Sequence, residues 1–145
     1  MRVVDSSVWI EHMADGSRGA ACAAYLADGR ETITPSQVLY EVYRWTLRHC
    51  GQRAAMEVVG HLEHTRIVPA DATVAIVAVD MSTDYGLSAA DAFIYATSRL
   101  QGCELVTADR DFRGLPGVIL IEDEGGADGT ATSSTSGFTT PVVHS

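Results

Sequence analysis

The sequence predicts an α/β protein built on a parallel sheet that helices cover on both faces. Five short runs rich in valine, isoleucine and threonine alternate with longer segments whose apolar residues recur every three or four positions. The runs have the length of strands, and the longer segments have the periodicity of amphipathic helices. Because parallel strands need crossovers that lie on the faces of the sheet, this alternation favours the α/β class.

The chain begins with a predicted strand and two predicted helices. Residues 1–5 are expected to form a short buried strand, because two β-branched valines precede a polar turn. A helix then begins at Asp5 and ends at Gly16. Ser17 can cap a second helix, which runs to Gly29.

In the middle of the chain, the sequence pattern predicts two more strands and two longer helices. Residues 32–34 form the second strand, which Pro35 ends, and a helix follows over 36–50 with a clear apolar stripe. Another helix covers about 52–64, and the third strand lies at residues 67–68.

The last elements follow the same alternation. A helix runs from Asp71 to about Gly86, and another runs from the capping-box-like start at Ser88 to Gly102. The fourth and fifth strands are predicted at 104–107 and 118–121. Residues 1–124 therefore form one predicted domain.

The remaining residues, 125–145, have a different composition. They are rich in glycine, serine and threonine, carry almost no charge and offer little apolar surface to bury. We predict a flexible tail there and assign it no activity.

Composition excludes several classes of protein. The three cysteines are widely separated without CxxC spacing, so neither a zinc ribbon nor a disulfide framework is indicated, and a reducing, cytoplasmic setting is expected. No signal peptide is apparent, and the longest apolar run, at residues 72–79, is too short to span a membrane. The net charge of −9 argues against a general nucleic-acid binder.

All ten basic residues are arginine, and the absence of lysine narrows the choice of phosphate-binding folds. A P-loop requires the lysine of its GxxxxGK[ST] motif, so that site is excluded. Receiver domains and haloacid-dehalogenase-type phosphatases generally need a lysine beside their reactive aspartate. The phosphatases also need a DxD motif, where this chain has Asp5-Ser6-Ser7.

Four carboxylates lie where this fold can bring them to one cleft. Asp5 and Asp109 follow the first and fourth predicted strands, and ligands of open parallel sheets bind beyond the carboxyl ends of the strands. Glu41 and Asp91 lie within helical patterns. Nearby positive charge is too sparse to neutralise such a cluster, so we expect a hard divalent cation, Mg²⁺ or Mn²⁺, and phosphate chemistry.

Each of these acids also has an ordinary structural explanation. Asp5 can cap the helix that follows it, and Asp91, three residues after a serine, suits a capping box and the helix dipole. Glu41 can occupy an exposed edge position, although it lies near an apolar stripe. Asp109 and Asp111 can be turn residues.

Four sequence blocks carry a family resemblance that the single residues do not. They are MRVVDSS at 1–7, SQVLYEV at 36–42, LSAADA at 87–92 and LVTADRDF at 105–112. In order and residue type these blocks resemble the PIN domain, and more narrowly the VapC-type toxins of bacterial toxin–antitoxin pairs. The resemblance covers residues 1 to about 122.

The resemblance implies a three-layer α/β/α fold with a parallel sheet of about five strands and an acidic pocket that binds Mg²⁺ or Mn²⁺. It implies an endoribonuclease that hydrolyses RNA phosphodiester bonds through metal-activated water. It also implies a homodimer and a cognate VapB-type antitoxin that blocks the pocket. The family's catalytic and metal-binding acids fall on Asp5, Glu41, Asp91 and Asp109; its supporting positions fall on Ser7, Thr107 and Asp111.

Several alternatives remain open from the sequence. A housekeeping RNA-processing PIN nuclease would share every motif. A structure-specific DNA 5′-nuclease uses a similar pocket, but this chain lacks added DNA-gripping elements and its charge is unfavourable. A catalytically silent binding module would not need all four acids.

Two other motifs favour structural explanations. His61-Leu62-Glu63-His64 is one residue short of an HxxEH zinc helix, so a solvated helix face is the preferred interpretation. Trp9, Tyr43 and Trp45 can stack on bases, but their helical spacing among aliphatic residues favours a core or a dimer interface.

Overall fold

In the computed structural model, which describes residues 1–123, five short strands form one parallel sheet. The predicted tail at 125–145 and its boundary at 124 lie outside the described residues. The strand order is β3-β2-β1-β4-β5, with every neighbouring pair parallel. The strands are β1 (Arg2–Val4), β2 (Thr32–Pro35), β3 (Arg66–Val68), β4 (Glu104–Thr107) and β5 (Val118–Leu120).

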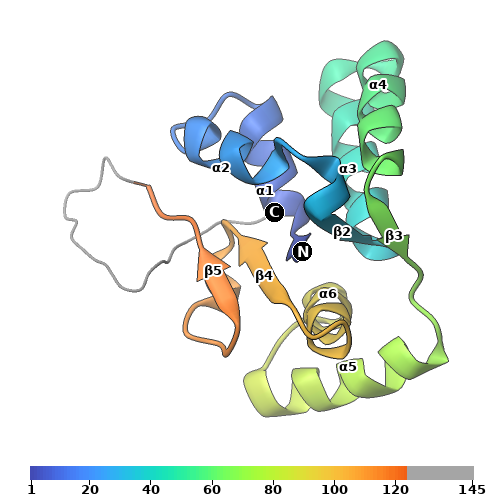
Figure 1. Cartoon of the computed structure of the whole chain (residues 1–145), viewed down its shortest axis with the longest axis vertical. Helices are drawn as coiled ribbons and strands as arrows, with labels where there is room; N and C mark the ends of the chain where they lie inside the picture. Colours follow the sequence, from blue (N-terminus) through green and yellow to red (C-terminus); the bar gives the residue numbers. More distant parts are fainter. Residues whose placement is uncertain (124–145) are drawn as a thin grey trace.

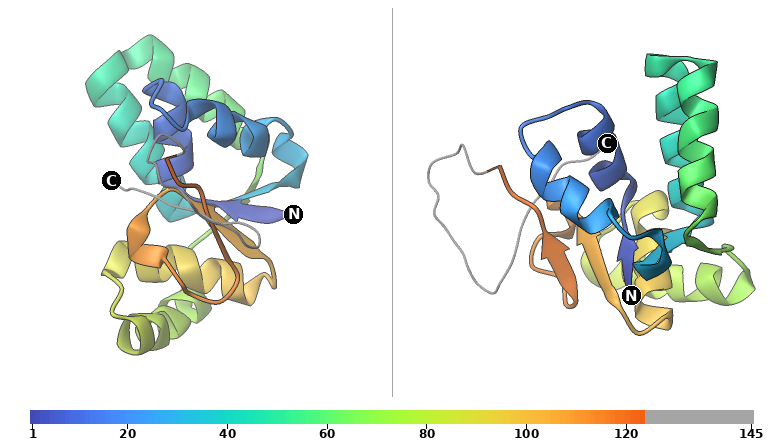
Figure 2. Two further views of the ribbon diagram at one scale, coloured as in Figure 1. Left: turned by 90° about the vertical axis from the view of Figure 1, so that its left-hand side faces the viewer. Right: turned by 45° about the horizontal axis from the view of Figure 1, so that its top comes forward.

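Helices cover both faces of this sheet, as Figures 1 and 2 show. Four helices lie on one face: α1 (Ser6–Met13), α2 (Gly19–Leu26), α3 (Ser36–Cys50) and α4 (Gln52–Glu63). Two lie on the other: α5 (Ala72–Tyr85) and α6 (Ala89–Leu100), of which α6 packs on β1 and β4. The predicted three-layer α/β/α architecture with five strands is confirmed.

The topology places a crevice between β1 and β4. The chain moves outward from β1 to β2 and β3, then crosses the opposite face and returns to β4 on the other side of β1. Strand order reverses at this point, which is where ligands bind in open α/β sheets. The pairing continues past β1, since the backbone N–H of Asp5 donates to the carbonyl of Val106 at 2.9 Å.

The core explains why such short strands are stable. Val3 and Val4 of β1, together with Leu105 and Val106 of β4, are buried between the two helical layers. Removing both faces of a strand from water is the main stabilising contribution for strands of this length. The apolar runs recognised in the sequence are therefore the centre of the sheet.

The structure differs from prediction at the second helix. Ser17 does not cap it. The helix begins at Gly19 with Arg18 in the N-cap position, and no side-chain hydrogen bond caps it, while the Ser17 hydroxyl donates to Asp123 at 2.9 Å. The helix also ends at Leu26 rather than Gly29, because a 3₁₀ turn, Gly29–Glu31, intervenes before β2. A serine near a helix start usually caps that helix, but here the Ser17 hydroxyl bonds to Asp123, which is far away in the sequence.

Within residues 1–123, no helix combines the length and apolar content needed to cross a membrane.

Candidate active site

An acidic cleft of about 190 Å³ lies at the carboxyl edge of the sheet, beside the crevice between β1 and β4. It brings together all four acids that the sequence singled out, from segments more than a hundred residues apart. Its lining residues are Asp5, Ser6, Glu41, Ser88, Ala90, Asp91, Asp109 and Asp111.

Asp5 forms the floor of the acidic cleft and is only 3% exposed. One carboxylate oxygen accepts the Ser6 N–H at 2.8 Å, and the other accepts the hydroxyls of Ser7 at 2.8 Å and Thr107 at 2.7 Å. Burial raises the pKa of Asp5, and these three hydrogen bonds oppose the shift. Asp5 therefore acts as a helix cap and as a cleft residue at once.

The two predicted supporting hydroxyls connect Asp5 to the opposite wall. Ser7 Oγ accepts the Ala108 N–H at 2.9 Å, and Thr107 Oγ1 accepts the Asp109 N–H at 3.0 Å. Each hydroxyl thus donates to Asp5 and accepts from the backbone that leads to Asp109. The structure therefore places both hydroxyls between the two acids, and their supporting role stays a prediction.

Glu41 reaches the acidic cleft from the second turn of α3. It is half-buried, and one carboxylate oxygen accepts the Ser6 hydroxyl at 2.7 Å. Burial is the main cause of the raised pKa of Glu41, and the charge of Asp5 adds to it. The exposed edge position that the sequence left open is therefore wrong for Glu41.

Ser6 is a site residue that sequence reasoning missed. It bridges the segment after β1 to α3, donating its hydroxyl to Glu41 while its N–H donates to Asp5. Its place directly after Asp5 was the only available signal. That position suggested a local turn, whereas its partner Glu41 is distant in sequence.

Asp91 sits at the start of α6, where Ser88 Oγ accepts its N–H at 3.3 Å. The cap is therefore made by Ser88, and the Asp91 carboxylate lines the cleft with Asp109 and Asp111. Burial, followed by the charges of Asp5 and Asp109, raises the pKa of Asp91 to about 8. The environment of Asp91 therefore disfavours its ionised form, and a bound cation would stabilise that form.

Asp109 follows β4 and begins the 3₁₀ turn Arg110–Phe112, accepting the Asp111 N–H at 2.9 Å. Burial and the nearby charges of Asp5 and Asp111 raise the pKa of Asp109 to about 7, although the bond from Asp111 opposes the shift. This turn holds Asp109 and Asp111 side by side.

The donor set of the acidic cleft fits a hard divalent cation. Asp91, Asp109 and Asp111 each offer a carboxylate oxygen within 4.8 Å of the others. The described lining residues are oxygen donors or alanine, with no arginine or histidine to neutralise the acids. Oxygen-only donors with uncompensated negative charge are the preferred site of Mg²⁺ or Mn²⁺. Asp111, predicted only as a supporting acid, is a direct member of this group.

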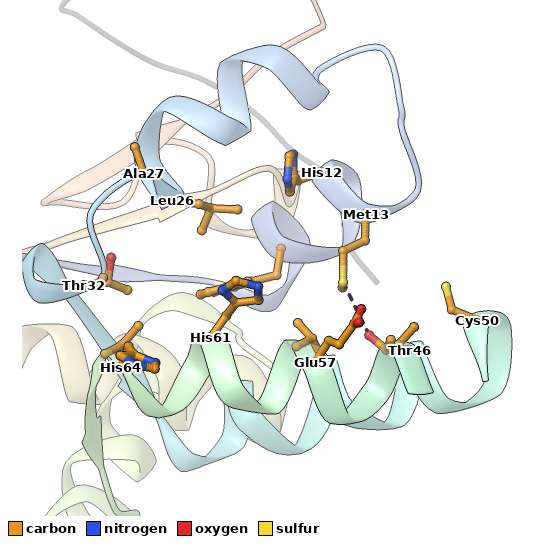
Figure 3. A pocket seen from close by; sticks show the side chains of 15 residues that line it. His12, Met13, Leu26, Ala27, Thr32, Thr46, Cys50, Glu57, His61 and His64 are labelled. Carbon is orange, nitrogen blue, oxygen red and sulfur yellow. Dashed lines mark hydrogen bonds between the residues drawn. The ribbon is translucent and has the colours of Figure 1, made fainter. Parts of the chain in front are cut away.

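A larger cavity of about 510 Å³ lies between α1–α2 and the α3–α4 hairpin (Figure 3). His12 of α1 and Glu57 and His61 of α4 line this cavity. Within residues 1–123, however, the ligand atoms of three residues lie close enough to share a metal ion only at Asp91, Asp109 and Asp111 of the acidic cleft. His61 and His64 are exposed, which agrees with the solvated helix face predicted for them. Trp9, another lining residue, is buried in the core.

The PIN domain family model matches residues 2–118, nearly the whole described chain. The chain belongs to the PIN domain family. PIN domains are nucleases that use divalent metal ions, which supports a nuclease with a metal site in the acidic cleft. The resemblance found in the sequence blocks is thereby confirmed at the level of the family.

Solved structures carry the same PIN fold. A toxin–antitoxin complex from Klebsiella pneumoniae has a TM-score of 0.70 at 22% identity, covering 82% of this chain and 96% of that one. VapC20 of Mycobacterium tuberculosis, a sarcin–ricin loop cleaving toxin, has a TM-score of 0.61 at 23% identity over 75% and 88%. DNA-bound VapBC from Salmonella typhimurium has a TM-score of 0.64 at 15% identity, covering 83% of this chain and 96% of that one. No curated protein shows a significant match to the sequence.

Proposed function

We propose that this PIN domain is an Mg²⁺- or Mn²⁺-dependent endoribonuclease and the toxin of a type II toxin–antitoxin pair. The observation that carries the proposal is the convergence of Asp5, Glu41, Asp91 and Asp109, with Asp111, in one small cleft free of lining cations. Burial and mutual repulsion of these carboxylates oppose their ionised forms, so local capping alone does not explain why they converge, whereas cation-assisted phosphate chemistry does.

Within the acidic cleft we assign metal binding and catalysis to the four acids, Asp5, Glu41, Asp91 and Asp109. Asp111 joins Asp91 and Asp109 on the wall where their oxygens lie closest. Asp5 accepts hydrogen bonds from the Ser6 N–H and from the hydroxyls of Ser7 and Thr107, which fix the orientation of its carboxylate at the cleft. A bound divalent ion supplies Lewis acidity, lowering the pKa of a water ligand and stabilising charge on the phosphate.

The toxin role rests on the solved structures with this fold. They include a toxin–antitoxin complex from Klebsiella pneumoniae and a sarcin–ricin loop cleaving toxin from Mycobacterium tuberculosis. By analogy we assign this chain an RNA substrate, a VapB-type antitoxin partner and a cytoplasmic location. We also propose a homodimer, supported by the outward-facing apolar side chains of Ile76 and Val79 on α5, which are 69% and 63% exposed.

The direct test is cleavage of total cellular RNA by the purified full chain, followed by mapping of the cut ends. Cleavage is expected with Mg²⁺ or Mn²⁺ and not with excess EDTA, and restoring Mg²⁺ should restore it. Cleavage that persists undiminished in EDTA would rule out the metal-dependent mechanism. RNA binding without cleavage under any metal would favour the catalytically silent module.

A growth experiment separates the toxin from a housekeeping RNA-processing nuclease. Expression of the chain in a bacterial host should arrest growth, and co-expression of the product of a neighbouring small reading frame should relieve the arrest. Unimpaired growth with active nuclease in the cell would favour the housekeeping function.

Removing the Thr107 hydroxyl is expected to reduce cleavage by about 10- to 100-fold, the scale typical of groups that orient metal ligands. Thr107→Val keeps the shape of the side chain but removes the donor to Asp5 and the acceptor for the Asp109 N–H. Thr107→Ser retains the hydroxyl and should stay within a few-fold of wild type. Equal losses in the two variants would mean that packing, and not the hydroxyl, matters at this position.

A further inference from the structure

A second cavity of about 480 Å³ adjoins the acidic cleft along α3. We call it the α3 pocket; its lining residues are Ser6, Ile10, Tyr40, Glu41, Arg44, Trp45, Arg48 and His49. Ser6 and Glu41 line both cavities and form the wall between them. A chain-like ligand lying in the α3 pocket would therefore lead directly to the candidate metal site.

The charge of the α3 pocket is opposite to that of the acidic cleft. Arg44 and Arg48 are exposed, and neither makes an ion pair with any residue in 1–123. They are one helical turn apart on α3, about 6 Å along the axis, so their side chains lie on the same face as Glu41. On a chain of net charge −9, two such guanidinium groups beside the site offer a local attraction for phosphate.

Aromatic surface completes the α3 pocket. Trp45 and His49 stack with ring centroids 4.5 Å apart and an interplanar angle of 16°, and His49 Nδ1 lies 3.0 Å from the Trp45 carbonyl. Tyr40 is 60% exposed, so most of its ring is accessible. Flat aromatic side chains beside guanidinium groups are the combination that proteins use to hold unpaired nucleotides.

We propose that the α3 pocket binds the single-stranded RNA segment next to the bond that is cut, with phosphates on Arg44 and Arg48 and an unpaired base on Tyr40. This inference rests on the proposed nuclease function and assigns its substrate-positioning residues. It explains how an acidic protein brings a polyanion to an acidic cleft, since the guanidinium groups offset the repulsion next to the scissile phosphate. A duplex, whose bases are stacked inside, would not present the base that Tyr40 needs.

The arginine arm of the test measures RNA binding separately from cleavage. Anisotropy of a labelled single-stranded oligoribonucleotide is titrated with the full chain in EDTA over a range of salt concentrations. The Arg44→Gln/Arg48→Gln variant should bind at least about tenfold more weakly, with the slope of log K against log[salt] smaller by about 0.7 for each lost phosphate contact. The charge-matched control, Arg53→Gln/Arg66→Gln, removes two exposed arginines outside both cavities and should bind like wild type.

The tyrosine arm separates base stacking from charge. Tyr40→Ala should weaken binding of the normal strand by about tenfold and leave binding of an abasic strand unchanged, while Tyr40→Phe should behave like wild type. With Mg²⁺ present, the arginine and alanine variants should raise KM more than they lower kcat.

The inference is overturned if the arginine variant binds RNA as tightly as wild type does. It is overturned equally if that variant keeps its RNA affinity and fails instead to bind an antitoxin. If RNA binding depends on the α3 pocket while the wild type cleaves nothing with any metal, the proposed nuclease function fails and the pocket assignment holds.

Discussion

Asp91→Asn is expected to lower RNA cleavage by about 10²–10³-fold and, at neutral pH, to raise the melting temperature of the metal-free protein. The loss of activity follows because the carboxylate oxygens of Asp91, Asp109 and Asp111 lie within 4.8 Å of one another, and a neutral amide is a poor ligand for a hard cation. The gain in stability follows because the pKa of Asp91 is raised to about 8, so folding at neutral pH opposes its ionised form. Asparagine carries no such penalty.

The measurement pairs initial cleavage rates in Mg²⁺ with thermal melts in EDTA. Asp80→Asn is a matched control, since it changes an exposed aspartate of α5 that lies outside the acidic cleft and should leave both quantities near wild type. A structural role for Asp91, such as a cap, predicts a lower melting temperature instead. Wild-type cleavage by Asp91→Asn would remove Asp91 from the proposed site.

The opposite signs of these two effects matter because two of the four acids, Asp5 and Asp109, also have a structural role. Asp5 caps α1, and Asp109 begins the 3₁₀ turn, as ordinary helix and turn residues would. The structural explanations that the sequence left open for them are therefore correct and compatible with the site. Asp91 differs from them, because the side chain of Ser88 caps α6 and the Asp91 carboxylate lines the cleft.

Local sequence signals were enough to predict the sheet and most of the helices. Runs of β-branched residues marked all five strands, and the apolar stripe of 36–50 predicted α3 with its observed ends. Such features depend on neighbours in the sequence, which a single chain displays directly. The second helix was misjudged because Ser17 bonds Asp123, a partner that only the folded chain brings near.

The same distinction applies to the candidate site. The positions of Asp5 and Asp109 after strands predicted that they would meet, because the carboxyl ends of adjacent parallel strands share an edge. The role of Ser6 depends on Glu41, and the α3 pocket depends on α3 lying beside α1. Sequence periodicity alone places Arg44 and Arg48 on a helix face without indicating that the face borders an acidic cleft.

The metal-free protein is expected to lose stability as the pH rises from about 5 to 8.5, and Mg²⁺ should oppose that loss. The pKa of Asp91 is raised to about 8 and that of Asp109 to about 7, so over this range the folded state holds protons that the unfolded state has released. The folding equilibrium then shifts toward the unfolded state with each added pH unit. Each group contributes at most about 1.4 kcal/mol per unit, and solvent at the open side of the acidic cleft reduces this.

A divalent cation binds the ionised carboxylates, so it competes with protons for the same oxygens. Its stabilising effect should therefore grow with pH, and the Mg²⁺ concentration that gives half-maximal stabilisation should fall. Thermal melts at several pH values, with EDTA or with Mg²⁺, measure both trends. Asp91→Asn should flatten the pH dependence of the melting temperature in EDTA, because the pKa of Asp91 is the higher of the two. Asp80→Asn should leave that pH dependence unchanged. A pH dependence that is identical in wild type and Asp91→Asn would mean that residues other than Asp91 bind the protons, and would contradict the raised pKa of Asp91.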